Sequence, residues 1–292
     1  MKHYAMAWKG RRLLFGGRTL LMGIVNVTPD SFSDGGEFAE TDAAVARGVR
    51  LVRDGADILD VGGESTRPGA DAVSVDEEMR RVIPVIEELA RQVSVPVSVD
   101  TSKASVAERA LEAGASMIND VTALRGDPRM GEVAARAGVP VILMHMLGTP
   151  RTMQEDPRYD DVVRDVRDFL AGAVDRAVAA GVDRGLIMAD PGIGFGKTLE
   201  HNLALIRRLG ELESLDVPIL LGHSRKAFIR KQLAKVAEGR EADMDQVIDG
   251  TVGVAAAAAA AGVHVIRVHD VARVRPAVVM ADALRRVEAE RS

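Results

Sequence analysis

Eight short apolar runs recur along the chain, and each ends on a cluster of polar residues. The runs with their polar ends span residues 20–36, 58–67, 95–101, 117–121, 141–145, 186–197, 219–226 and 263–270. Most are continuously apolar rather than alternating, which is typical of strands that are buried on both faces of a parallel sheet. The polar ends therefore predict one shared rim at the carboxyl ends of the strands.

Helical segments separate these runs. Apolar residues at helical spacing predict one helix from Thr41 to Gly55 and others at 75–92, 102–113, 127–137, a long segment ending at 180, 199–209, 225–261 with an interruption near Gly239, and 271–288. The repeat of about 35 residues is the size of a βα unit. The pattern predicts an α/β fold, the (β/α)8 TIM barrel. A doubly wound open sheet is the alternative, because periodicity does not show closure.

Residues 1–19 precede the first run and contain the only tryptophan, Trp8, together with a Gly16-Gly17 turn. This segment predicts a short N-terminal hairpin that caps the floor of the barrel. We expect a single domain over residues 1–292, with the hairpin in 1–19 and the barrel in 20–288.

Composition narrows the classes of function. The chain has 292 residues, 47% of them hydrophobic, and a formal net charge of -5, which does not indicate a nucleic-acid binder. Cysteine is absent, which excludes disulfides, thiolate metal sites and cysteine nucleophiles. The longest apolar run, 252–268, is broken by Gly262 and His264, so no membrane helix is expected, and the N-terminus lacks an apolar signal core. A cytoplasmic enzyme is the expectation.

Three polar residues stand at the ends of apolar runs: Asp100, Asn119 and Asp190. A lone aspartate at such a position more often caps the next helix. Two aspartates and an asparagine at the same height on three strands instead favour a binding site, because buried carboxylates need donors. Such a set suits a flat heterocycle with an amino-amide edge, which offers paired donors as a guanidinium does.

Cationic residues form a second set at the same rim: Arg67, Lys226, Arg267 and His269. Arg267 and His269 are two positions apart on a strand and should project to the same side. Together with Asn26 they are suited to a pyrophosphate, and Asn26 or Asp34 has the oxygen that Mg²⁺ prefers. For His269 alone, a position beside a helix cap, satisfied by Asp270, is an equally good interpretation.

Several common motifs fail on inspection. The segment 191–198 resembles a P-loop, but Pro191 stands where the first glycine is required. Its glycines instead favour close approach of the backbone to a planar ligand, with Phe195 as an aromatic wall. His145 and His223 stand in no metal-ligand spacing, and Ser224 is not in a nucleophile elbow, so hydrolase and zinc chemistry are not indicated.

The motifs at residues 26–36, 60–69, 190–197, 222–226 and 267–270 together resemble the dihydropteroate synthases, a TIM-barrel family of folate synthesis. The resemblance extends from Leu20 to the last helix. It implies condensation of 6-hydroxymethyl-7,8-dihydropterin pyrophosphate with 4-aminobenzoate, which gives 7,8-dihydropteroate and pyrophosphate. It also implies a dissociative substitution, with Mg²⁺ as cofactor, and a homodimer packed through late helices.

The resemblance also implies a role for each matching residue. The pterin would be held by Asp100, Asn119, Asp190 and Lys226. The pyrophosphate would be held by Asn26, Arg67, Arg267 and His269, with Asn26 on Mg²⁺. The 4-aminobenzoate site, where sulfonamides compete, would comprise Phe32, Thr66, Arg67, Pro68, Phe195 and Ser224. Phe32 and Asp34 match a first loop that closes over the site. The residues expected to carry catalysis are Asn26, Asp34, Arg67, Lys226, Arg267 and His269.

Two alternatives use the same pterin pocket. Corrinoid-linked methyltransferases bind methyltetrahydrofolate in a similar barrel, but they need neither a pyrophosphate clamp nor the 65–68 loop, and this chain has both. A catalytically silent paralogue would bind a pterin without turning it over. The presence of Asn26, Asp34, Arg67 and His269 argues against silence.

Overall fold

The structure is a computed structural model, and it describes residues 1–27, 36–65, 69–149, 151–237 and 239–289. Five of the predicted site residues lie outside this described part of the chain: Phe32, Asp34, Thr66, Arg67 and Pro68.

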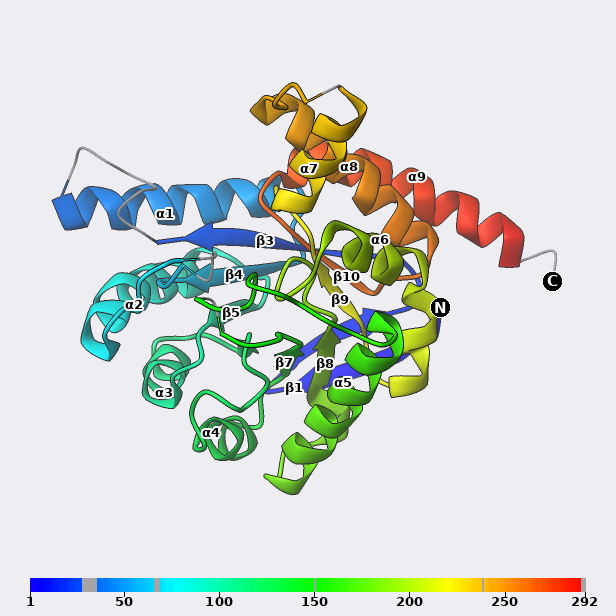
Figure 1. Cartoon of the computed structure of the whole chain (residues 1–292). Coiled ribbons are helices and arrows are strands. Elements are labelled where there is room, and N and C mark those ends of the chain that lie inside the picture. The colour runs from blue at the N-terminus through cyan, green and yellow to red at the C-terminus, as the bar shows by residue number, and fades with distance from the viewer. Residues whose placement is uncertain (28–35, 66–68, 150, 238, 290–292) are drawn as a thin grey trace.

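Eight parallel strands form the centre of the molecule (Figure 1). They are β3 (Leu20–Asn26), β4 (Ile58–Gly62), β5 (Val97–Asp100), β6 (Met117–Asp120), β7 (Val141–Met144), β8 (Ile187–Asp190), β9 (Leu220–Gly222) and β10 (Val265–Val268). Their order is β8-β7-β6-β5-β4-β3-β10-β9, and a bridge between Ala189 and Ile219 joins the two ends. The sheet is therefore a closed (β/α)8 barrel, which confirms the predicted fold over the open-sheet alternative.

Helices surround the strands. They are α1 (Gly36–Arg53), α2 (Val75–Gln92), α3 (Ala104–Glu112), α4 (Met130–Ala137), α5 (Val162–Ala179), α6 (Leu199–Arg207), α7 (Ala227–Val236), α8 (Met244–Ala260) and α9 (Val271–Ala289), with short 3-10 turns η2 (Arg184–Leu186) and η3 (Leu209–Leu215). Helix α1 begins at Gly36, five residues before the predicted Thr41. The predicted interruption in 225–261 is confirmed, because α7 and α8 are separate helices. None of the helices in the described ranges is long and apolar enough to cross a membrane.

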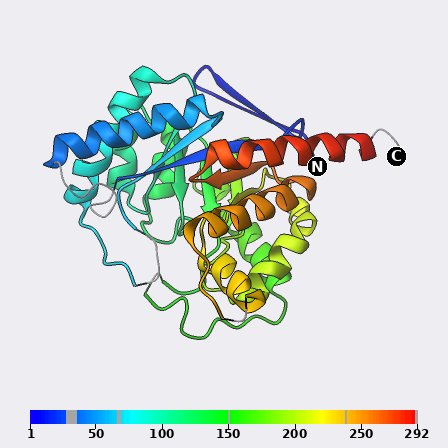
Figure 2. The same ribbon diagram turned by 90° about the horizontal axis from the view of Figure 1, so that it is seen from above.

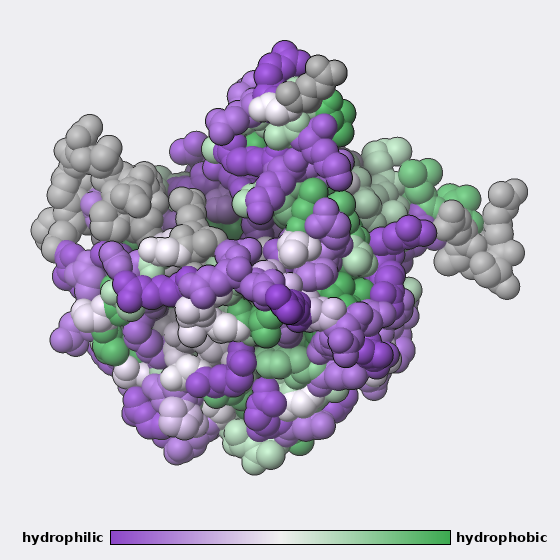
Figure 3. Space-filling model, in the orientation of Figure 1, coloured by the Kyte–Doolittle hydropathy of each residue, from purple (hydrophilic) through white to green (hydrophobic). Residues whose placement is uncertain are grey.

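The strands are buried because helices cover their outer face while side chains fill the interior. All five residues of β4 are buried, including Asp60. Burial of a large aliphatic side chain is worth roughly 1.5–3 kcal/mol. The helical faces supply the partners; α2, for example, buries Val82, Val85 and Ile86. In the view of Figure 3, hydrophilic residues dominate the surface of the molecule.

The N-terminal hairpin pairs β1 (Tyr4–Trp8) with β2 (Arg11–Phe15) and lies at the amino ends of the strands. Its Tyr4 ring packs edge-on against His264, with ring centroids 5.2 Å apart. In Figure 2, β3 runs away from the hairpin, so the hairpin and the strand ends that carry the polar residues are on opposite sides. The predicted cap over the barrel floor is confirmed.

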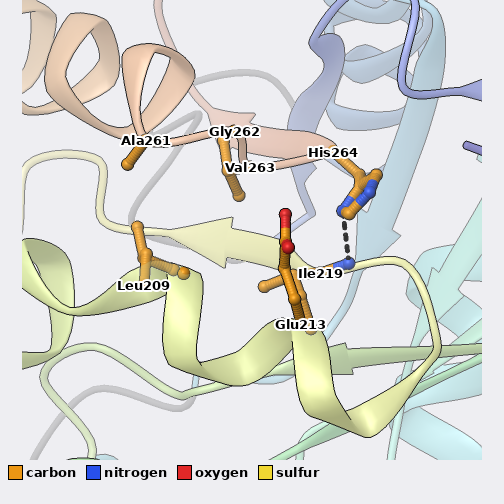
Figure 4. A pocket seen from close by; sticks show the side chains of 8 residues that line it. Leu209, Glu213, Ile219, Ala261, Gly262, Val263 and His264 are labelled. Carbon is orange, nitrogen blue, oxygen red and sulfur yellow. Dashed lines mark hydrogen bonds between the residues drawn. The ribbon is translucent and has the colours of Figure 1, made fainter. Parts of the chain in front are cut away.

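A small cavity lies at this floor, between η3 and the start of β10 (Figure 4). It holds about 10 Å³ and is lined by His264, Glu213 and Leu209 among others. One water molecule needs about that volume. This cavity therefore has no room for a substrate, and the polar mouth at the other end of the barrel is the candidate site.

Candidate active site

The predicted acidic and amide residues meet at the carboxyl ends of the strands. Asp100 is the last residue of β5, Asn119 is the third of β6, and the two are register partners on neighbouring strands. Asp190 ends β8, which β7 separates from β6 in the barrel. All three side chains are mostly or fully buried, although each is polar. The common-rim prediction is confirmed for these residues.

Arg267, from β10, connects this set across the barrel. Its Nε donates to Asp60 Oδ2 at 2.6 Å, and a terminal nitrogen donates to Asp100 Oδ2 at 2.6 Å. Asn119 Nδ2 donates to the same Asp60 oxygen at 2.9 Å. Burial acts to lower the pKa of Arg267, but the two carboxylates outweigh it and raise that pKa. The guanidinium is therefore a permanent cation at the centre of the mouth.

The acidic residues of the mouth are held in an unusual electrostatic environment. Burial raises the pKa of Asp100 to about 7, although Arg267 acts in the opposite direction. Burial also raises the pKa of Asp190 above its ordinary value, against the effect of Lys226. Desolvation of carboxylates produces such shifts, and they are common at functional sites. A ligand that donates N–H hydrogen bonds would stabilise the ionised form of both carboxylates.

Lys226 stands at the start of α7, after β9. Its Nζ donates to the carbonyl of Ile193 and lies 4.1 Å above the centroid of the Phe195 ring. Burial lowers the pKa of Lys226 to about 7, while Asp190 acts to raise it. The ammonium thus has a carbonyl and an aromatic face as neighbours, together with the charge of Asp190, and it titrates near neutral pH.

Asp190 and Arg267 share Gly222 as a neighbour, which places the two predicted sets in one mouth. A Cβ added at Gly222 would lie 3.5 Å from Asp190 Oδ2 and 3.8 Å from Arg267 Cδ. Asp190 and Arg267, which are 77 positions apart in the sequence, therefore lie side by side. The predicted convergence is borne out for the described part of the chain.

His269 lies just after β10 and contacts two other predicted residues. Ser224 Oγ accepts from the His269 backbone N–H at 3.2 Å and lies 2.9 Å from His269 Nδ1. Asn26 Nδ2 lies 3.5 Å from His269 Nε2. Burial lowers the pKa of His269 to about 3, so the ring is neutral. Asp270 pairs with Arg225 at 2.5 Å, so the interpretation of His269 as a residue satisfied by Asp270 is wrong.

The glycines of the 191–198 loop have left-handed backbone angles, and a neighbouring segment of the chain explains each. A Cβ on Gly192, at φ +68°, would lie 1.9 Å from the carbonyl oxygen of His145. A Cβ on Gly196 would lie 2.7 Å from Leu147. Gly192 and Gly196 therefore allow close approach of the loop after β7, whereas a Cβ on Gly194 would lie 3.0 Å from Lys226 Cδ. Phe195 packs in a separate apolar cluster with Val121, Met144, Met146 and Met153.

Sequence reasoning missed three buried polar residues beside the site. Asp60 received no role, although it binds both Arg267 and Asn119. Lys197 and His145 form a buried pair, with Nζ 2.8 Å from Nδ1, and Lys197 also donates to the Phe195 carbonyl at 3.0 Å. An aspartate inside the apolar run 58–61 was the available signal for Asp60. The Lys197–His145 pair had no such signal, because the partners are 52 residues apart.

A divalent cation would find few protein ligands here. Within the described ranges there is no group of three or more histidine, aspartate or glutamate side chains that could hold a metal. Asn26 presents Nδ2 to His269, so its carboxamide oxygen is the half of the side chain that remains for another ligand. Mg²⁺ commonly takes one or two protein ligands and completes its shell with substrate phosphates and water. The residues present fit that mode of binding.

Comparisons with known proteins agree with this geometry. Residues 22–269 match the family described as pterin binding enzyme. A dihydropteroate synthase of Synechocystis sp. is 45% identical over 270 residues, covering 92% of this chain and 91% of the relative. The structure of Xanthomonas albilineans dihydropteroate synthase with 4-aminobenzoic acid is 47% identical, with a TM-score of 0.87 over 97% of this chain and 98% of that chain. A complex from the same organism with 7,8-dihydropteroate is 45% identical, with a TM-score of 0.83 over 96% and 98%. The chain belongs to the family of pterin binding enzymes, among its dihydropteroate synthases.

Proposed function

We infer that the chain condenses 6-hydroxymethyl-7,8-dihydropterin pyrophosphate with 4-aminobenzoate and releases 7,8-dihydropteroate and pyrophosphate. One observation carries the inference: Asp100, Asn119, Asp190 and Lys226 surround the same mouth as Arg267 and His269. Acceptors for a heterocycle thus lie beside donors for an anion. The similar proteins named above are dihydropteroate synthases, and the similarity to this chain covers nearly their whole length.

The pterin is held by the acidic and amide residues in this proposal. Asp100 and Asp190 accept from the amino and ring N–H groups, which suits carboxylates whose burial favours a donor-rich ligand. Asn119 lies beside Asp100 and adds a carboxamide to the same edge. Lys226, beside Asp190, donates to a ring carbonyl or nitrogen. The carboxylates also favour the positive charge that develops on the ring during the reaction.

The pyrophosphate is held by Arg267, His269 and Asn26. The permanent charge of Arg267 stabilises the leaving oxygens. The neutral imidazole of His269 presents an N–H at Nε2 when the Ser224 hydroxyl donates to Nδ1 and the pyrophosphate takes the place of Asn26 Nδ2. We propose that Asn26 contributes its oxygen to Mg²⁺. When bound, Mg²⁺ neutralises charge on the pyrophosphate as a Lewis acid. Asp34 and Arg67 are proposed to complete this clamp from the two loops outside the described residues.

The 4-aminobenzoate is proposed to bind near Phe195 and Ser224, with Phe32, Thr66, Arg67 and Pro68 supplied by the same two loops. Ser224 Oγ contacts His269, which supports an amine site next to the proposed leaving-group site. An aromatic amine attacks best when it is held in line with the carbon that loses pyrophosphate. Sulfonamides would compete here.

The reaction exchanges one bond for another at the pterin methylene carbon. The C–O bond to pyrophosphate breaks first, and its electron pair leaves with the pyrophosphate oxygen. The amine nitrogen then bonds to the same carbon and loses a proton to water or to the released pyrophosphate. Water must be excluded while the cation exists, because it would trap the cation as an alcohol. Closure of the first and second loops, 26–36 and 62–75, is the proposed means; residues 28–35 and 66–68 of them lie outside the described part of the chain.

The decisive experiment measures pyrophosphate release with each substrate alone and with both. We expect release and formation of dihydropteroate only when pterin pyrophosphate and 4-aminobenzoate are both present with Mg²⁺. Binding of the pterin without release would indicate a silent paralogue. Methyl transfer from methyltetrahydrofolate to a corrinoid would instead indicate the methyltransferase alternative.

We also propose a cytoplasmic homodimer that packs through α8 and α9. Large apolar side chains on α9 are exposed: Val279, Met280, Leu284 and Val287. Figure 3 shows hydrophobic residues over the projecting part of this helix, and α8, which is rich in alanine, packs beside it. Light scattering should give twice the chain mass for the wild type and the single chain mass for Leu284→Glu. A monomeric wild type at micromolar concentration would contradict this assembly.

A further inference from the structure

We propose that Asp60 is a positioning residue that sets the hydrogen-bonding pattern of the mouth, and thereby selects a donor-rich heterocycle over one that lacks the exocyclic amine. The proposal rests on the proposed function, because it specifies how the pterin site distinguishes its ligand. Asp60 lies one layer below the mouth, on β4, and no role in binding substrate is assigned to it.

A single oxygen of Asp60 organises two residues from distant strands. Oδ2 accepts from Asn119 Nδ2 of β6 at 2.9 Å and from Arg267 Nε of β10 at 2.6 Å. The Asp60 side chain is fully buried, so water does not compete for these contacts. Buried carboxylates of this kind impose geometry on their donors, since any partner that turns away leaves a charge unpaired.

The contact with Asp60 fixes which way the Asn119 carboxamide points. A carboxylate is only an acceptor, so the NH₂ half of Asn119 must face Asp60. The carbonyl half is then the half left for a ligand. On the neighbouring strand, Asp100 is a second acceptor in register with Asn119. Two adjacent acceptors complement a ring edge that carries an amine and a ring N–H.

Asp60 has a second effect through Arg267. The guanidinium donates to Asp60 through Nε and to Asp100 through a terminal nitrogen. A ligand that takes the Asp100 carboxylate displaces only the second of these contacts. The Nε contact with Asp60 keeps the guanidinium within the mouth, where its freed nitrogens are available to the pyrophosphate of the same substrate.

The test is Asp60→Asn, with affinity measured by calorimetry for pterin pyrophosphate and for its 2-oxo analogue, in which oxygen replaces the exocyclic amine. An asparagine at position 60 can donate, which allows the Asn119 carboxamide to reverse. We expect affinity for the pterin to fall about tenfold to a hundredfold and the preference over the 2-oxo analogue to shrink. The KM for 4-aminobenzoate should change much less.

A swapped pair separates positioning from structural damage. In Asp60→Asn combined with Asn119→Asp, the carboxylate at position 119 accepts from the amide at position 60. Its other oxygen is then an acceptor for the ligand, as the Asn119 carbonyl is in the wild type. This double variant should regain the preference for the pterin, whereas Asn119→Asp alone, with two facing carboxylates, should not. The matched control is Asp120→Asn, because buried Asp120 bonds Thr122 and Leu124 instead. It should lose stability and keep the preference.

Each outcome decides the matter. Unchanged pterin preference in folded Asp60→Asn overturns the proposal, as does a swapped pair that behaves no better than Asn119→Asp. If Asp60→Asn does not fold, the comparison of the swapped pair with Asn119→Asp makes the decision by itself. A wild-type chain that binds no pterin pyrophosphate would refute the proposed function, which is a separate result.

Discussion

Arg267 donates to the Asp100 carboxylate at 2.6 Å, so the cation proposed to bind the pyrophosphate contacts the anion proposed to bind the pterin. The guanidinium and the amino-pyrimidine edge of a pterin present similar pairs of donors. In the proposed binding mode, the pterin would replace the guanidinium as the donor to Asp100. The guanidinium of Arg267 would then be free to bind the pyrophosphate of the same substrate.

Replacement of Arg267 by methionine should destabilise the fold in a pH-dependent way. It leaves the carboxylates of Asp60 and Asp100 buried without their cation, which typically costs about 3–5 kcal/mol. Loss of the cation raises the Asp100 pKa further above its unfolded value, so the folded state binds more protons than the unfolded state. The cost should be larger at pH 8 than at pH 5.5 in urea denaturation.

The control for this variant is Arg18→Met. Arg18 also pairs with an aspartate, Asp57, but its side chain is 54% exposed at the floor. Exposed pairs contribute about 0–1 kcal/mol. Equal losses for the two variants, or an Arg267→Met cost that does not vary with pH, would show that the central carboxylates are not held as described.

Lys226 should make pterin binding weaken as the solution becomes alkaline. Its pKa is about 7, so the ammonium that we propose faces the pterin is present below neutral pH and is lost above it. Ionisation of Asp100 and Asp190 should instead strengthen pterin binding as the pH rises. The pH dependence of the affinity is therefore compared with that of Lys226→Arg, whose side chain stays charged. Affinity should fall more steeply from pH 7 to pH 9 in the wild type. Parallel profiles of affinity against pH for the two proteins would show that Lys226 does not bind the pterin.

Sequence patterns predicted the barrel because burial leaves a direct trace in the chain. Eight apolar runs at even spacing require a sheet that is covered on both faces, and their polar ends had to meet once the sheet closed. Helix starts were less certain, since α1 begins at Gly36 within a polar segment where periodicity gives no signal.

Contacts across the barrel were beyond the reach of the sequence. Asp60 sits among apolar neighbours, and its partner Arg267 is 207 residues away. No local spacing in the sequence relates β4 to β10, which flank β3 in the barrel. The glycines of the 191–198 loop were recognised, but the segment that approaches them was not, because the loop after β7 meets them only in three dimensions.

Gly192 should not tolerate alanine. Its φ is +68°, and a Cβ would lie 1.9 Å from the backbone oxygen of His145, which side-chain motion does not relieve. We expect Gly192→Ala to lose roughly 3 kcal/mol of stability or more. Most activity should be lost as well, because the Gly192 N–H donates to Asp190 Oδ1 at 2.7 Å and helps to hold that side chain. Gly210→Ala is the control, because a Cβ there meets nothing within 4 Å. Thermal unfolding of both variants measures the difference in stability. A Gly192→Ala variant nearly as stable as the wild type would contradict the backbone geometry.

His264 should make the floor of the barrel sensitive to acid. Its Nδ1 accepts from the Ile219 backbone N–H at 3.0 Å (Figure 4). Nε2 therefore carries the hydrogen, which faces the Lys2 carbonyl at 3.1 Å. Protonation would add a hydrogen to the acceptor nitrogen and break the first of these bonds. Burial accordingly lowers the pKa of His264 to about 4, from 6.5.

The sign of the effect follows from proton binding. Between pH 6.5 and 4 the unfolded chain binds a proton at His264 and the folded chain does not, so this residue's contribution to stability is lost as the pH falls. The loss is about 1.4 kcal/mol per pH unit. In His264→Asn, whose side-chain oxygen still accepts from Ile219, that part of the slope should disappear. Phe15→Leu is the control, because Phe15 packs edge-on at 6.3 Å from the same ring and does not titrate. Phe15→Leu should lower stability equally at pH 7 and pH 5. If stability varied with pH identically in the wild type and both variants, a neutral His264 would be refuted.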